Sequence, residues 1–304
     1  MIVELPDTST NDVAKKIVEV RESGGAVSLG RVLTLVVCAD HGEPTEGAIE
    51  GAIGASREHP SRVIVVSRGE RSEDSRLDAE IRVGGDAGAS EVVILSLSGE
   101  LADHPHSVVT PFLLPDTPVV TWWPGAAPED PAADPIGQLG RRRILDATRS
   151  AHPETVLARR LATYSPGDTD LAWTRITHWR AILASAVGRP PHTAITSVEV
   201  TGQQVAPSVD LLAGWLRATL GVPVYRRVGS FEVRVYREEG PTILAVDENN
   251  NAIITAPGKP DGRVAMMHRD LPMCLIEELR RLDSDEVYAE ALRGVTEIIV
   301  EGVA

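Results

Sequence analysis

Three consecutive arginines, Arg141, Arg142 and Arg143, are followed by Asp146. Guanidinium groups bind phosphates and carboxylates through paired hydrogen bonds, so this segment could hold a phosphate or the acidic surface of another protein. The same residues also suit a charged turn in which Asp146 balances the arginines. The residues alone leave both interpretations open.

The side chains that most often catalyse reactions do not gather into a recognisable arrangement. His104 and His106 would present two imidazoles on one face only if their segment were extended, and no third metal ligand is near them in sequence. The chain contains no Gly-x-Ser-x-Gly sequence, and neither cysteine has an obvious base beside it. We therefore expect a protein that is not an enzyme, with no catalytic residue, no metal and no cofactor.

A dinucleotide-binding turn needs several glycines between a strand and a helix. The segment 39–43 follows an apolar run but has one glycine and two acids, which would repel phosphate. The segment 84–88 is richer in glycine but precedes an expected strand, so a tight turn is the better interpretation. Neither segment predicts a nucleotide site.

Residues 118–123 form a short apolar run, and Pro124-Gly125 follow it directly. This pattern predicts a strand that ends in a turn. Because side chains alternate along a strand, Trp122 and Trp123 must point to opposite faces of the sheet. One tryptophan can sit in the core, and the other needs a covering helix or a partner protein. The pair also lies at the carboxyl end of its strand, where α/β sheets place ligand sites.

Composition excludes several classes of partner. The formal net charge of −14 argues against nucleic acid or an anionic membrane surface. Apolar runs reach only strand length, and no secretion signal begins the chain, so we expect a cytoplasmic protein. Cys38 and Cys274 lie in apolar patterns and are expected to be buried, inert thiols. Only Lys15, Lys16 and Lys259 are lysines, and all other basic residues are arginines.

Strands alternate with helices in the first half, which predicts a layered α/β domain with a mostly parallel sheet. Gly47, Gly51 and Gly54 would let one of the helices pack closely on the sheet. The strand 77–83 alternates charged and apolar residues and is expected at an exposed edge. The expected strands are 32–38, 62–67, 77–83, 91–97 and 118–123, and the expected helices are 10–23, 44–57, 99–113 and 153–164.

The segment 165–168, Ser-Pro-Gly-Asp, is the clearest break in the chain, so we place domains at 1–165 and 166–304. The proline-rich stretch 124–139 is expected to be a long loop that is either functional or mobile. The second domain is predicted to be mixed α+β with a partly antiparallel sheet. Its expected helices are 169–187, 208–220, 272–282 and 284–292, and its expected strands are 194–200, 222–228, 230–237, 242–247 and 252–255, with a hairpin turn at 248–251.

Five segments in fixed order carry a family resemblance: 24–37, 56–68, 108–125 with its Trp-Trp-Pro-Gly, 141–148, and 168–186 with its Asp-Leu-Ala-Trp-Thr-Arg. This set resembles the glucose-6-phosphate dehydrogenase assembly protein OpcA family of actinobacteria and cyanobacteria. The resemblance implies a non-catalytic factor that binds glucose-6-phosphate dehydrogenase of the pentose phosphate pathway and promotes its oligomeric assembly and activation.

Under this hypothesis the partner interface would comprise Trp122, Trp123, Pro124, Arg141, Arg142, Arg143 and Asp146. The thioredoxin control linked to cyanobacterial members is not expected here, because neither cysteine has a nearby partner in sequence. The alternative hypothesis is a sugar-phosphate or nucleotide sensor or enzyme, with its ligand at the carboxyl ends of strands 32–38 and 118–123.

Overall fold

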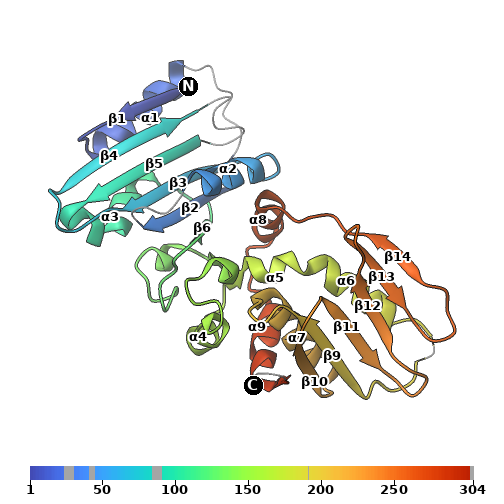
Figure 1. Cartoon of the computed structure of the whole chain (residues 1–304). Coiled ribbons are helices and arrows are strands. Elements are labelled where there is room, and N and C mark those ends of the chain that lie inside the picture. The colour runs from blue at the N-terminus through green and yellow to red at the C-terminus, as the bar shows by residue number, and fades with distance from the viewer. Residues whose placement is uncertain (24–30, 41–44, 84–90, 191, 302–304) are drawn as a thin grey trace. The chain divides into compact units, whose positions relative to one another are not determined.

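The computed structural model describes residues 1–23, 31–40, 45–83, 91–190 and 192–301. The chain forms two compact units that interleave along the sequence (Figure 1). Unit 1 consists of Met1–Arg149, Ser165–Thr169 and Asp270–Ser284, and unit 2 consists of Ser150–Tyr164, Asp170–Arg269 and Asp285–Ala304. The domain boundary at 165/166 stays a prediction.

Unit 1 is built on an eight-stranded sheet. Its central strands β5, β3, β2, β6 and β7 are parallel, and β1 and β4 run antiparallel to their neighbours. The mostly parallel α/β sheet predicted for the first half is therefore confirmed. In spatial order the strands are β1 (Ile2–Leu5), β4 (Arg76–Arg82), β5 (Glu91–Ser98), β3 (Ser61–Arg68), β2 (Leu33–Asp40), β6 (Val119–Trp122), β7 (Arg142–Leu145) and β8 (Asp168–Asp170).

The strand β4 is not at the edge of the sheet, contrary to the prediction for 77–83. β1 pairs with it in antiparallel register, with Val3 opposite Ile81. The alternation along β4 is as expected, because Leu77, Ala79 and Ile81 are buried. Alternation of charged and apolar residues indicates that one face of a strand is more exposed to solvent than the other. It does not indicate whether another strand pairs with its edge.

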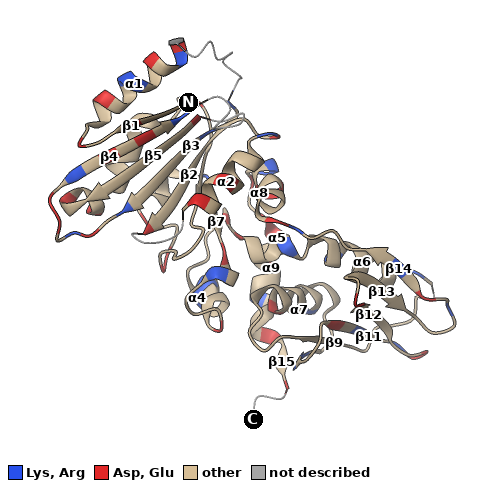
Figure 2. Cartoon of the chain, turned by 45° about the horizontal axis from the view of Figure 1, so that its top comes forward, with Lys and Arg blue, Asp and Glu red and all other residues tan. Residues whose placement is uncertain are grey.

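The helices of unit 1 include α1 (Thr10–Ser23), α2 (Glu46–Ala55), α3 (Pro105–Val109) and α8 (Leu271–Arg280). α1 buries Val13, Ile17 and Val20, while charges of both signs follow one another along its length (Figure 2). The helix expected over 99–113 is broken into α3 and two flanking 3₁₀ helices, Gly99–Asp103 and Thr110–Phe112. Pro105 and Pro111 explain the breaks, because proline has no N–H to continue a helix.

Two of the three glycines of α2, Gly51 and Gly54, face another helix and not the sheet. A Cβ on Gly51 would lie 2.8 Å from Leu271 Cδ2, and one on Gly54 would lie 3.0 Å from Pro272 Cβ. Both contacts are with α8, which is more than 200 residues away along the chain. The prediction that glycines let α2 pack closely on another element is right. That element is α8, however, and not the sheet as predicted.

A buried carboxylate ties three parts of unit 1 together. Glu91, at the start of β5, accepts hydrogen bonds from Arg21 Nε at 2.6 Å and from Arg31 Nη2 at 2.9 Å. Arg62 Nε lies 2.7 Å from the other carboxylate oxygen. Three guanidinium groups thus compensate the charge of a side chain that is almost fully buried.

Two aspartates order the loop 124–139. Asp130 Oδ1 accepts hydrogen bonds from the backbone N–H groups of Ala132 and Ala133, both at 3.0 Å. Asp134 Oδ1 does the same for Ile136 at 2.9 Å and Gly137 at 3.1 Å. These turns present the buried Ile136 to the core. The loop is therefore held by local hydrogen bonds, as aspartate-centred turns allow.

Unit 2 contains a seven-stranded sheet in which only the pairs β9–β10 and β10–β15 are parallel. The predicted partly antiparallel sheet is confirmed. Asn250 adopts a positive φ of 61° in the turn between β12 and β13, as the hairpin prediction requires. In spatial order the strands are β14 (Gly262–Ala265), β13 (Asn251–Thr255), β12 (Thr242–Val246), β11 (Glu232–Tyr236), β9 (Ser197–Gly202), β10 (Val224–Val228) and β15 (Ile299–Val300).

The helices of unit 2 are α4 (Val156–Thr163), α5 (Leu171–Arg175), α6 (Thr177–Val187), α7 (Pro207–Leu220) and α9 (Glu286–Gly294). The single helix expected over 169–187 is wrong, because it is divided into α5 and α6 at Ile176. Residues 171–174 are all buried, whereas α6 buries only Leu183 and Ala186. Ile176 therefore separates the short, mostly buried helix α5 from the amphipathic helix α6.

Trp173 belongs to an aromatic cluster in unit 2, in which its ring centroid lies 6.1 Å from that of Tyr288. Its Nε1 donates to Asp285 Oδ2 at 2.9 Å, and Asp285 Oδ1 also accepts from the N–H of Tyr288 at the start of α9. The Arg180 guanidinium lies 3.5 Å from the centre of the indole ring, a cation–π distance. Asp285 therefore caps α9 and fixes the indole at the same time.

Both cysteines are buried and neither forms a disulfide. Burial raises the pKa of the Cys38 thiol far above its ordinary value, so this thiol stays protonated. Among the residues that the structure describes, no helix combines the length and apolar character needed to cross a bilayer.

The contact between α2 and α8 can be tested with two glycines of the same helix. We expect Gly51→Ala to be less stable than Gly47→Ala by about 1–3 kcal/mol, because the new methyl group must displace Leu271. Nothing lies within 4 Å of a Cβ at Gly47, so this variant keeps the gain in helix propensity without a clash. Urea unfolding midpoints measure the difference, and equal midpoints would show that α8 does not lie on α2.

Candidate functional site

The seven residues predicted to form a partner interface lie in or beside β6 and β7, two neighbouring parallel strands of unit 1. The structure brings them together in one region of the sheet. Six of them are buried and only Arg141 is exposed. The buried members are Trp122, Trp123, Pro124, Arg142, Arg143 and Asp146.

The two tryptophans point to opposite faces of the sheet, as predicted. Trp122 is in register with Val37 of β2, whereas Trp123 belongs to the core cluster that contains Val36 and Cys38. Their exposed fractions are 0% and 2%. Both indoles are therefore covered by the chain itself, and neither is displayed on the surface.

Arg142 makes a buried ion pair with α8. Its Nη2 lies 2.5 Å from Glu278 Oε2, and its Nη1 donates to the backbone carbonyl of Asp283 at 2.6 Å. Both side chains of the pair are 4% exposed. The arginine thereby attaches β7 to a helix 136 residues later in the chain.

Arg143 makes the second buried ion pair, with the segment 165–169. Its Nε donates to Asp168 Oδ1 at 2.5 Å, and its Nη2 donates to the carbonyl of Pro166 at 2.7 Å. Gly167 lies between them with a φ of +99°, and a Cβ there would be 2.7 Å from the carbonyl oxygen of Arg141. Only glycine fits this backbone conformation and this close approach.

Arg141 pairs with Asp283 at 2.6 Å, and these side chains are 62% and 87% exposed. Asp146, by contrast, accepts hydrogen bonds from the backbone N–H and hydroxyl of Thr148. The three arginines pair with Asp283, Glu278 and Asp168, and Arg142 and Arg143 lie in a strand, so the segment is not a charged turn. The partners Glu278 and Asp283 are too distant in sequence for any local pattern to reveal.

These hydrogen bonds decide what the arginine segment can do. The side chains of Arg142 and Arg143 are directed to carboxylates and carbonyls of their own chain, away from solvent. A phosphate clamp at these two residues would require both buried pairs to open, which is costly. The segment is therefore built to hold the fold, and Arg141 is its exposed member.

Unit 2 contains a groove of about 220 Å³ between the start of α6 and the residues after β14. Trp179 forms its aromatic wall and packs on Phe231, with ring centroids 4.7 Å apart. Met267 is 64% exposed at the groove. Tryptophan, methionine and arginine are the residues enriched in the cores of protein interfaces. The remaining lining residues are Arg175, His178, Asn250, Met266, His268 and Arg269.

The candidate metal ligands form no site in the part of the chain that the structure describes. The rings of His104 and His106 are 6.3 Å apart in an edge-on arrangement. No group of three or more His, Cys, Asp or Glu among the described residues could hold a metal ion. The glycine-rich segment 84–88 and most of the turn 39–43 lie outside the described residues.

Two family models match consecutive parts of the chain. Residues 52–162 match a model described as the N-terminal domain of the glucose-6-phosphate dehydrogenase subunit. Residues 166–292 match a model described as the C-terminal domain of the same glucose-6-phosphate dehydrogenase subunit. A search of the curated proteins finds no match.

Solved structures show only distant likenesses. A structure titled glucose-6-phosphate 1-dehydrogenase from Mycobacterium avium is 12% identical with a TM-score of 0.46, and the match covers 88% of this chain and 91% of that chain. An oxidoreductase from Sinorhizobium meliloti is 10% identical with a TM-score of 0.38, covering 87% and 86%. These likenesses are too weak to carry an argument about function.

We expect Trp122→Ala and Trp123→Ala each to lower the free energy of unfolding by about 3–5 kcal/mol, because both indoles are fully buried. Trp179→Ala is the comparison, and its half-buried side chain predicts a smaller loss. Urea denaturation followed by circular dichroism gives the three values. A Trp122 or Trp123 variant as stable as the native protein would show that this indole is exposed in solution.

We expect Glu278→Ala to cost about 3–5 kcal/mol, because it leaves the Arg142 guanidinium buried without its carboxylate. Replacing the pair together by Arg142→Met and Glu278→Leu should restore most of that loss. Arg141→Ala is the control, since its exposed ion pair contributes little. A double-mutant cycle measures the coupling, and a coupling near zero would contradict the buried pair.

Proposed function

Because this chain belongs to the glucose-6-phosphate dehydrogenase subunit family, we propose that it is a non-catalytic, cytoplasmic partner of glucose-6-phosphate dehydrogenase that promotes assembly and activation of the enzyme's oligomer. The observation that carries this proposal is that the two family models match consecutive segments spanning most of the chain. The family name points to an association with the dehydrogenase, and the assembling and activating action is the step we add.

Linkage supplies a mechanism that needs no chemistry from this chain. A protein that binds the assembled form of an enzyme more tightly than its separate protomers shifts the population toward the assembled form. The shift cannot exceed the difference between the two binding free energies. The relevant property of this chain is therefore the surface it offers and how rigidly it holds that surface.

The arrangement around β7 supports this view. Residues that could have served chemistry, such as Arg142 and Arg143, are instead joined to carboxylates of the same chain. We propose that Trp122, Trp123, Pro124, Arg142, Arg143 and Asp146 act on binding indirectly, by holding this part of unit 1 in place. Arg141, which is exposed, is the member of the set that would touch the dehydrogenase.

The groove beside Trp179 supplies a second contact in this proposal. It combines an aromatic ring, two methionines and two arginines, and no acidic residue is among those that line it. A long exposed methionine such as Met267 adapts readily to an apolar partner surface. We propose that this groove receives a loop of the dehydrogenase.

The proposal is tested by mixing the purified chain with the dehydrogenase and measuring oligomer mass, KM and kcat. We expect a shift to the larger oligomer together with a change in substrate affinity. Met267→Asp should weaken complex formation by about 2 kcal/mol, roughly 30-fold in Kd, if the groove is a hot spot. Val205→Asp is the matched control, because Val205 is also exposed in unit 2 but lies outside the groove.

Unchanged oligomer mass and unchanged kinetics on mixing would overturn the proposal. Turnover of a metabolite by the chain alone would favour an enzyme. Strong thermal stabilisation by a sugar phosphate or a nucleotide, with no effect of the dehydrogenase, would favour the alternative hypothesis of a sensor.

A further inference from the structure

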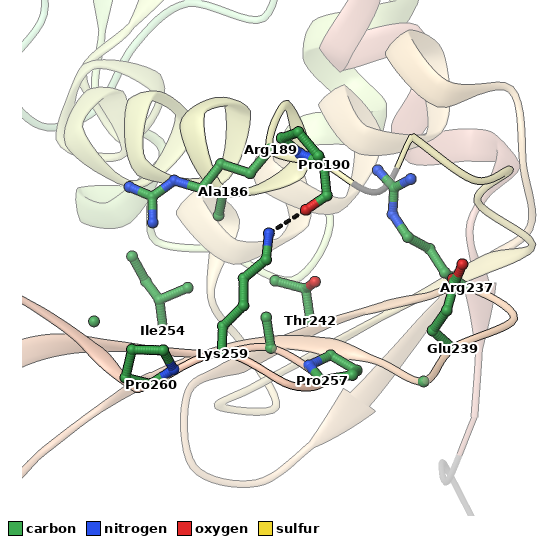
Figure 3. A pocket seen from close by; sticks show the side chains of 13 residues that line it. Ala186, Arg189, Pro190, Arg237, Glu239, Thr242, Ile254, Pro257, Lys259 and Pro260 are labelled. Carbon is green, nitrogen blue, oxygen red and sulfur yellow. Dashed lines mark hydrogen bonds between the residues drawn. The ribbon is translucent and has the colours of Figure 1, made fainter.

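A cavity of about 120 Å³ lies in unit 2, between the residues that follow α6 and two turns of the sheet (Figure 3). One turn joins β11 to β12 and contributes Arg237 and Glu239, and the other joins β13 to β14 and contributes Lys259. Apolar side chains of Ala186, Ile254, Pro257 and Pro260 complete the wall.

The charge around this cavity differs from that of the chain as a whole. Arg189, Arg237 and Lys259 line it together with one acid, Glu239. A hydrogen bond from Thr193 lowers the pKa of Glu239, so its carboxylate is ionised and engaged at 2.7 Å with that hydroxyl. The lining therefore carries an excess of two positive charges in a protein with a formal net charge of −14.

Two backbone carbonyls orient Arg237. Its two terminal nitrogens donate to the carbonyl oxygens of Thr193 and, at 2.8 Å, of Val187. Its charge also helps to lower the pKa of the Glu239 carboxylate, the one acid of the lining. The positive potential that Arg237 contributes to the cavity is thus held rigidly, as a pre-organised anion site requires.

Lys259 extends across the cavity. Figure 3 shows its side chain rising between Ile254 and Thr242 toward Pro190, with Arg189 and Arg237 on either side. Its Nζ donates to the carbonyl oxygen of Pro190. An ammonium group has three N–H donors, so further donors remain for an acceptor inside the cavity. A chain with only three lysines thus places one of them at this cavity.

We propose that this cavity is a binding site for one small anionic group, a phosphate or a carboxylate. Lys259 and Arg189 would donate to the anion, Arg237 would supply fixed positive potential, and Ile254 and Pro257 would contact the apolar atoms next to it. The volume of about 120 Å³ is well below the ~300–1,000 Å³ of pockets for drug-sized ligands. It suits a single anionic group.

The three lysines make a selective experiment possible. Labelling lysine alone with ¹³C gives one set of side-chain signals each for Lys15, Lys16 and Lys259. The chain is titrated at constant ionic strength with inorganic phosphate, with glycerol 3-phosphate, with acetate and with a short glutamate-rich peptide. We expect the Lys259 signal to shift and saturate, while the signals of Lys15 and Lys16 stay nearly unchanged.

The four titrants separate the sources of the anion. Tighter binding of a phosphate compound points to a free metabolite, and tighter binding of the peptide points to an acidic segment of a protein. Isothermal titration calorimetry, which does not need the Lys259 signal, should show that Lys259→Met and Arg189→Gln each weaken the affinity about tenfold, as the loss of a charge-assisted hydrogen bond predicts. Lys16→Met, on α1 in unit 1, is the matched control and should leave the affinity unchanged.

Equal and unsaturated shifts of all three lysines would show only general screening and would overturn the proposal, as would full affinity in both the Lys259 and the Arg189 variants. Both residues are exposed, so their variants should fold as the native chain does. The experiment uses this chain alone. Its outcome is therefore independent of whether the dehydrogenase binds.

Discussion

Unit 1 depends on the rule that a buried charge must be paired. β7 contains two successive buried arginines, and successive residues of a strand face opposite sides of the sheet. Arg142 therefore reaches Glu278 of α8, while Arg143 reaches Asp168 in the segment 165–169. Each partner comes from a part of the chain far from β7 in sequence. Removing either carboxylate would leave an uncompensated guanidinium inside the protein, which explains why both distant segments belong to unit 1.

This arrangement changes how the most distinctive segments of the sequence are understood. The Trp-Trp-Pro-Gly run and the three arginines look like an exposed recognition motif, because such residues are common at interfaces. In the structure they are mostly buried, and they fix β6, β7 and α8 in one arrangement. A sequence signature of this kind identifies the fold of a family more directly than it identifies a binding surface. The surface has to be sought among exposed residues, such as Arg141 and Met267.

Local patterns predicted the strands and helices well but not their long-range partners. The apolar runs that became β2 and β3, and the positive-φ turn at Asn250, depend on neighbouring residues and were found. Three features were missed because each depends on a distant segment. β1 covers the edge at β4, α8 occupies the space that Gly51 leaves, and Glu278 neutralises Arg142. The break at Ile176 was missed for another reason, since one apolar stripe continues across both helices. For the site, the residues were grouped correctly in space, but their exposure could not be read from their types.

The buried pairs also bear on how such a chain could influence an enzyme. Binding costs free energy whenever loops and side chains must be ordered, and a surface that is already rigid avoids much of this cost. Buried ion pairs contribute little net stability, yet they tolerate few alternative arrangements, because every alternative leaves a charge unpaired. In unit 1 the Arg142–Glu278 pair holds β7 and α8 in a fixed arrangement, next to the exposed side chains of Arg141 and Asp283. Under the proposed function the chain acts through its surface, and it then gains more from this rigidity than from additional stability. In that proposal the buried arginines are the means by which the sequence specifies the surface.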